Sequence, residues 1–152
     1  MEPRELIWLE LMKYYGLKEI SGPLHNKTIL AWFKDMGYPE IDNDETAWCS
    51  LTINKMAKDC GLEYSGKLDA RSWMKTGKGT DTPHLGTVTV FWREQKSGWK
   101  GHVGLFAGYN KDKSQIITFG GNQNNMIGFY SYPVAAADFG LLGFRELNYS
   151  HS

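Results

Sequence analysis

The chain has 152 residues, of which 41% are hydrophobic and 22% are charged, a composition typical of a soluble globular protein. Lysine plus arginine and aspartate plus glutamate number 17 each, so the formal net charge is zero. This balance argues against a nucleic-acid binder that relies on bulk positive charge. The length fits one domain spanning residues 1–152 and is enough to bury a sizeable core.

The N-terminal stretch "MEPRELIWLELMKYYG" lacks the pattern of a secretory signal peptide, because acidic residues interrupt it and no basic start precedes an apolar run. No apolar run is long enough for a membrane span. We therefore expect synthesis in the cytoplasm without a signal peptide, no membrane insertion, and another route of release or export if the protein acts elsewhere.

Apolar residues at helical spacing predict a first helix within residues 4–16 that ends at Gly16. Its expected apolar face has the i, i+3, i+4 and i+7 pattern, at Trp8, Leu11, Met12 and Tyr15.

A second helix is predicted over residues 26–37, with Asn26 as a possible cap. Its inward-facing residues should be Ile29, Leu30, Phe33 and Met36. A third helix is predicted over residues 43–61, capped by Asp44 or Thr46 and ended by a glycine, and a short helical turn over 68–74.

The second half of the chain predicts strands, because short runs rich in β-branched and aromatic residues alternate with turn residues. The predicted strands are 86–92, 102–109, 114–119, 126–131 and 141–147, with turns at 110–113 and 120–125 and a loose tail at 148–152. Helices followed by a meander of strands favour an α+β domain in which N-terminal helices pack on a central antiparallel sheet.

Both cysteines fall in the third predicted helix, at Cys49 and Cys60. On a helix they would lie about 16 Å apart, too far for a disulfide. Cys60, in the last turn, is expected to be a small buried hydrophobe. Cys49, in the first turn, lies where free backbone N–H groups and the helix dipole favour a thiolate. It is either a nucleophile or another core residue.

A thiol nucleophile needs a base, which is most often a histidine. His25, His84 and His151 fall in a turn, a loop and the tail. His102 begins an otherwise apolar strand in "WKGHVGLFAGY", with glycines on either side, and either caps the sheet edge or faces a cleft.

The next strand ends in "GGNQNN". Antiparallel pairing could bring Asn122 or Gln123 beside His102, where an amide oxygen would fix the imidazole tautomer. The alternative is a simple turn, which is favoured for Asn124 and Asn125 and less so for Asn122.

Taken in order, "ETAWCS", "ARSWM", "GHVG" and "GGNQ" resemble the papain-like peptidoglycan hydrolases, the CHAP and NlpC-type cysteine amidases and endopeptidases, and among them small phage- and prophage-associated lysins. The resemblance extends upstream over most of the chain. It implies a papain-like fold, with Cys49 as nucleophile, His102 as general base and Asn122 as the orienting residue. Gln123 is the alternative, because many relatives carry a carboxylate or another histidine at this third position.

The resemblance also implies a monomer that cleaves an amide bond of the wall peptide through a thioester, with peptidoglycan as partner and no cofactor. Trp48, Trp99 and Gln123 are candidates for substrate binding, Trp92 for the cleft wall, and Trp48 is equally compatible with the core. No spacing predicts a metal site. The competing functions are a wall-peptide-binding module without catalysis, a structural component of a phage particle or secretion device, and an exported antibacterial amidase toxin.

Overall fold

The computed structural model describes residues 1–20, 25–41 and 48–150, and within these ranges it contains four helical segments and a six-stranded antiparallel sheet. The helical segments are α1 (Pro3–Met12), α2 (Lys27–Asp35), α3 (Cys49–Asp59) and the 3₁₀ helix η1 (Ala70–Lys75). The strands are β1 (Lys78–Thr80), β2 (Val88–Arg93), β3 (Gly101–Tyr109), β4 (Gln115–Gln123), β5 (Met126–Pro133) and β6 (Phe139–Glu146). The predicted combination of helices with an antiparallel sheet is confirmed.

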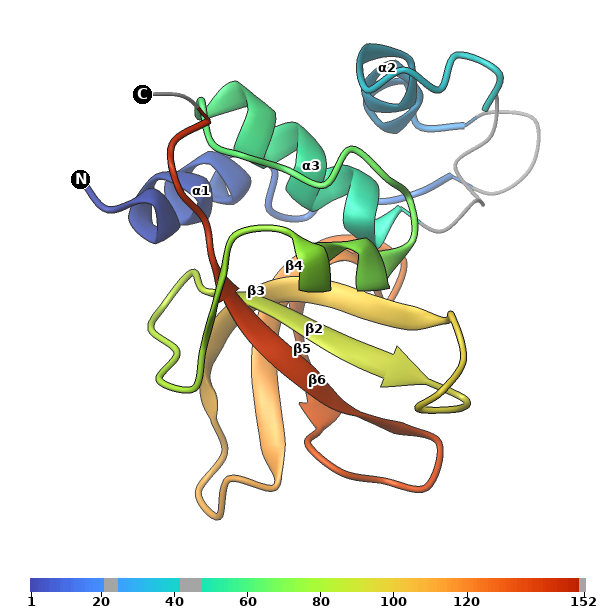
Figure 1. Ribbon diagram of the computed structural model, residues 1–152. Helices are drawn as coiled ribbons and strands as arrows, with labels where there is room; N and C mark the ends of the chain where they lie inside the picture. Colours follow the sequence, from blue (N-terminus) through green and yellow to red (C-terminus); the bar gives the residue numbers. More distant parts are fainter. Residues whose placement is uncertain (21–24, 42–47, 151–152) are drawn as a thin grey trace.

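The strands lie in the order β1-β6-β2-β3-β4-β5, so β5 forms one edge. Figure 1 shows the three α-helices on one side of a strongly curved sheet, with α1 and α3 closer to it than α2. The short strand β1 was not predicted, since its three residues carry no alternating apolar pattern; only pairing with β6 defines it.

Alternation along the strands divides the buried residues into two clusters. On β2 and β3, Val90 and Val103 face the helices and belong to the larger cluster, which α1, α2 and α3 complete. Phe91 and Phe106 belong to a second cluster, formed by strand residues alone. The curvature of the sheet allows this second face to bury aromatic side chains without any helix.

The buried side of α1 differs from the predicted face. Ile7 and Leu11 are buried, whereas Met12 and Tyr15 are 44% and 58% exposed. The helix ends at Met12, so Tyr15 lies beyond it and the i+7 position no longer falls on the same face.

The capping of α2 was predicted correctly. The Asn26 side chain accepts hydrogen bonds from the backbone N–H groups of Thr28 and Ile29, at 2.9 and 3.2 Å. Trp32 is buried beside Ile29 and Phe33, whereas Leu30, which was predicted to point inward, is only half-buried.

Helix α3 begins at Cys49, with Trp48 as its N-cap residue, and Cys60 is the C-cap. The predicted caps Asp44 and Thr46 lie outside the described residues. The first-turn position of Cys49 is confirmed, and both cysteines are free.

The C-terminal segment is bound rather than loose as far as Ser150. The Asn148 N–H donates to Glu63 Oε1 at 2.7 Å, the Ser150 N–H donates to the Gly61 carbonyl at 2.9 Å, and Leu62 forms a bridge with Tyr149. The prediction of a loose tail was therefore wrong over 148–150.

Across the described ranges, no helix combines the length and apolar character that crossing a membrane requires.

Candidate active site

Cys49 occupies the first position of α3, where the backbone N–H groups have no partner within the helix. The thiol is almost closed off, since the residue is 5% exposed. Backbone N–H groups of Val103 and Ser50 and the imidazole of His102 interact with its sulfur. The start of α3 and the first residues of β3 therefore meet at the cysteine.

His102 is the second residue of β3 and is buried. Its Nε2 atom lies 2.9 Å from Oε1 of Gln123, at the end of β4. Because Nε2 is engaged by Gln123, Nδ1 is the nitrogen left to face the Cys49 sulfur.

The hydrogen bonds of Gln123 fix which imidazole nitrogen carries the proton. Its amide nitrogen donates to the carbonyls of Thr118 and Gly128, at 3.0 and 2.6 Å, and its Oε1 accepts from the Thr118 hydroxyl at 2.7 Å. Oε1 is thus an acceptor, so His102 Nε2 must donate to it. The neutral imidazole then carries its proton on Nε2 and presents the Nδ1 lone pair to the thiol.

The amide that contacts the His102 imidazole is that of Gln123, the alternative, and not that of Asn122, the preferred assignment. Regular alternation from Thr118 through Gly120 would place residue 122 on the face of His102. The β4–β5 register shifts between Gly120 and Gln123, and Asn122 has a φ of 55°. The extra residue moves the next side chain onto that face, as a bulge does.

Three glycines make this arrangement possible by close approach. A Cβ atom at Gly104 or Gly120 would lie 3.1 or 3.2 Å from Gln123 Oε1. A Cβ atom at Gly121 would overlap the Thr52 hydroxyl of α3 and the ring of Trp48, the N-cap residue of that helix. These three glycines therefore serve packing around Gln123. Gly120 and Gly121 belong to β4, so the turn predicted over 120–125 is confined to Asn124 and Asn125.

The pKa values of the two thiols are shifted in opposite directions. Burial raises the pKa of Cys49, but the charge and hydrogen bond of His102, with the backbone N–H groups of Val103 and Ser50, outweigh burial and lower it below the ordinary value. Burial, with the carboxylates of Glu10 and Asp59, raises the pKa of Cys60 to about 11. Cys49 is therefore the thiol that ionises readily.

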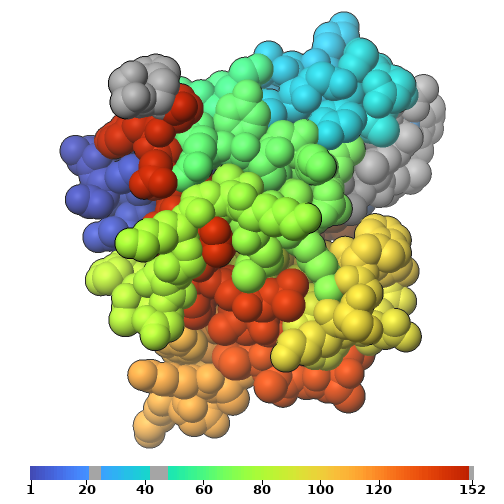
Figure 2. Space-filling model, in the orientation of Figure 1, coloured from blue at the N-terminus to red at the C-terminus, as the bar shows by residue number. Residues whose placement is uncertain are grey.

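The tryptophans predicted to bind substrate have different positions. Trp48 is fully buried, and its Nε1 donates to Glu19 Oε2 at 3.1 Å, so it belongs to the core and lines no cleft. Trp99 is 71% exposed on the β2–β3 loop, and Trp92 is half-buried over Gly140. Figure 2 shows this loop, in yellow, as a projection beside the green segment that contains η1.

Two neighbours of the site were not found in the sequence. Thr118 supports Gln123 from the middle of β4, and Tyr132 of β5 places its ring 4.7 Å from the imidazole of His102. Thr118 could have been found from the sequence, because it lies two residues before Gly120 on the same strand and therefore faces the same side of the sheet. The contact of Tyr132 arises from sheet curvature, which no local pattern indicates.

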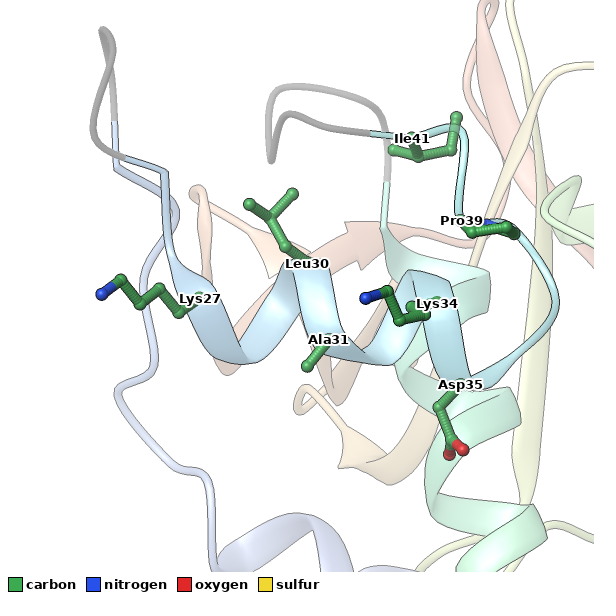
Figure 3. Close-up of a pocket in the computed structure, with 7 residues that line it drawn as sticks. All are labelled: Lys27, Leu30, Ala31, Lys34, Asp35, Pro39 and Ile41. Carbon is green, nitrogen blue, oxygen red and sulfur yellow. The ribbon is translucent and has the colours of Figure 1, made fainter.

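A surface hollow of about 700 Å³ lies on the outer side of α2 (Figure 3). Its lining residues are Lys27, Leu30, Ala31, Lys34, Asp35, Pro39 and Ile41. None of these belongs to the group around Cys49, so the hollow is separate from the candidate active site.

Among residues 1–20, 25–41 and 48–150, no three His, Cys, Asp or Glu side chains are grouped so as to hold a metal ion.

Comparison with known proteins adds no relative: no family model matches the chain, and neither a curated protein nor a solved structure matches it. The functional assignment therefore rests on the chemistry of Cys49, His102 and Gln123.

Proposed function

We propose that this chain is a papain-like cysteine hydrolase that cleaves an amide bond in the peptide of bacterial peptidoglycan. One observation carries the proposal: the thiol at the start of α3 interacts with His102, whose Nε2 is held 2.9 Å from the buried Gln123 amide. A nucleophile, a base beside it and a group that orients the base are what thiol acyl transfer requires.

The reaction begins with attack of the Cys49 thiolate on the amide carbonyl. The proton held on Nδ1 of His102 passes to the leaving amine, which departs and leaves a thioester. Water then gives a proton to His102 and attacks the thioester, which releases the acid and restores the Cys49 thiolate beside the protonated imidazole. The backbone N–H of Cys49, which has no carbonyl partner within α3, is suited to stabilise the oxyanion.

Gln123 supports both steps through the tautomer. An imidazole with its proton on Nε2 accepts from the thiol through Nδ1, and the positive charge that follows is stabilised by the Gln123 oxygen. An amide performs this role without a net charge of its own.

The peptidoglycan substrate is proposed from the motif order around Cys49, His102 and Gln123, with a phage or prophage lysin as the setting. Amidase action at the sugar–peptide bond and endopeptidase action within the peptide use the same three groups. The digestion experiment therefore identifies which bond is cleaved, and cleavage of either bond supports the proposal.

The test is digestion of purified peptidoglycan, with identification of the new amino and carboxyl ends by mass spectrometry. Wild type and Cys60→Ala should release the same fragments, whereas folded Cys49→Ala should release none. Cys60→Ala is the matched control, since it removes a thiol from the other end of the same helix. Equal fragment release by Cys49→Ala, or no cleavage by wild type across walls of different cross-link chemistry, would overturn the proposal.

A further inference from the structure

Tyr132 contacts the candidate base from a strand that shares no ladder with it. It lies on the edge strand β5, two strands away from β3, yet its ring centroid is 4.7 Å from that of His102, at an interplanar angle of 40°. This is the shortest of the ring contacts that His102 makes within the described residues.

The Tyr132 ring is itself held in place by other rings. Phe139 stacks on it at 5.1 Å and 11°, Phe91 lies at 5.3 Å, and Tyr130 at 4.9 Å. Phe91 is also 6.4 Å from His102. The imidazole of His102 therefore lies against a contiguous set of rings. The same set leaves the Tyr132 ring little freedom to turn.

The other restraints on the imidazole are its hydrogen bonds, from Nε2 to Gln123 and with the Cys49 sulfur through Nδ1. Hydrogen bonds at the two nitrogens leave the ring plane free to tilt about the line that joins them. A ring packed against the face of the imidazole restricts the tilt, and so keeps Nδ1 directed at Cys49.

We propose that Tyr132 is a positioning residue for His102: its aromatic ring, packed against the imidazole, keeps Nδ1 directed at the Cys49 thiol. The inference rests on the proposed function for its catalytic meaning, but the geometry it concerns exists before any substrate binds.

The ring and not the hydroxyl carries this role. No hydrogen bond joins the Tyr132 hydroxyl to any described residue. Burial first, and then the nearby Cys49 thiolate, raise the pKa of Tyr132, so the phenol stays neutral and adds no charge to the cysteine–histidine pair.

Three variants separate the ring from the hydroxyl. Tyr132→Phe keeps the ring and Tyr132→Leu removes it. Phe129→Leu is the matched control, because Phe129 lies on the same strand and, among the described residues, its ring contacts are with neither Tyr132 nor His102. The first readout is the rate of Cys49 alkylation by iodoacetamide at neutral pH, measured by mass spectrometry. Tyr132→Phe and Phe129→Leu should react within about twofold of wild type, and Tyr132→Leu about tenfold more slowly or worse.

The second readout is the ¹⁵N spectrum of the His102 imidazole. Wild type and Tyr132→Phe should show the same Nδ1 shift, set by contact with the Cys49 sulfur, and Tyr132→Leu should show a shift displaced from it. Wild type should also show a nuclear Overhauser effect between the His102 and Tyr132 rings, which needs no variant to fold.

Unchanged alkylation in folded Tyr132→Leu, equal loss in Tyr132→Phe, or absence of that Overhauser effect would each overturn the proposal. Neither readout uses peptidoglycan, so failure of wall digestion would contradict the proposed substrate and leave this inference to be judged by its own result.

Discussion

Gln123 Oε1 lies 2.9 Å from His102 Nε2, while the Gln123 amide nitrogen donates to two backbone carbonyls. A flip of the Gln123 side-chain amide, which exchanges its oxygen and nitrogen, would therefore lose three hydrogen bonds and place the NH₂ group against the imidazole. This relationship defines the tautomer of His102, and through it the direction in which the thiol proton moves.

Replacement of Gln123 by alanine should lower the rate of hydrolysis by about 10- to 100-fold, the worth of one to two strong buried hydrogen bonds. The matched control is Asn122→Ala, which removes the adjacent amide and should cost less than about threefold. Hydrolysis rates on one defined wall-peptide substrate provide the measurement. If Asn122→Ala is the damaging change and Gln123→Ala is silent, the third role belongs to Asn122.

Gly121 should be intolerant of any side chain, because an added Cβ would overlap Thr52 of α3 and its N-cap residue Trp48. We expect Gly121→Ala to reduce the free energy of unfolding by about 1–3 kcal/mol and to displace Gln123. Gly98→Ala is the control, since its Cβ would meet nothing closer than 3.3 Å. Urea unfolding measures the stability, and a Gly121→Ala chain as stable as Gly98→Ala would refute the close approach.

Arg71 of η1 holds the β2–β3 loop through three backbone carbonyls: Lys100 at 2.8 Å, Lys96 at 2.7 Å and Gln95 at 2.6 Å. Loss of this fork should free the loop that carries Trp99. We expect Arg71→Ala to raise the hydrogen-exchange rate of amides 95–100 and Arg71→Lys to restore little, because an ammonium cannot reproduce the planar fork.

The control for Arg71 is Lys75→Ala, which removes an exposed cation from the same 3₁₀ helix. Exchange in residues 95–100 should be unchanged in this variant. Equal exchange in Arg71→Ala and wild type would show that the loop holds its conformation without the arginine.

Substitution of Trp48 and of Trp99, the two tryptophans predicted to bind substrate, should have different effects on the free energy of unfolding. Trp48→Phe loses the hydrogen bond to Glu19 and leaves a void, so the free energy of unfolding should fall by about 1–3 kcal/mol. Trp99→Ala should leave stability within about 0.5 kcal/mol, since the side chain is largely exposed. If Trp99 contacts substrate, KM rises in the same variant; unchanged KM would remove Trp99 from the substrate site.

Local patterns predicted the elements that carry the site better than the site itself. The position of Cys49 in the first turn of α3 and that of His102 near the start of β3 both follow from residues close in sequence, although α3 begins later than the predicted helix. The choice between Asn122 and Gln123 depends on a bulge that forms where Gly121 meets α3, and that contact is tertiary. The proximity of Tyr132 depends likewise on curvature of the whole sheet.

Trp48 shows why residue type alone was insufficient. A tryptophan before a candidate nucleophile is compatible with a cleft wall or with the core, and its sequence position does not distinguish them. Its burial follows from packing over Gly121 together with a hydrogen bond to Glu19, which is 29 residues away. The apolar face predicted for α1 was wrong for a related reason: the apolar spacing did not show that the helix ends at Met12.

The most direct test of the central claim, that His102 activates Cys49, is the rate of alkylation of each cysteine as a function of pH, resolved by mass spectrometry. The lowered pKa of Cys49 keeps it a thiolate at pH values where a free thiol is protonated, so its rate should reach half its maximum below pH of about 8.5. Cys60, with a pKa of about 11, should stay nearly unreactive at neutral pH. His102→Ala should move the Cys49 midpoint upward. Equal, slow labelling of both cysteines, or a Cys49 midpoint unaffected by loss of His102, would contradict the account.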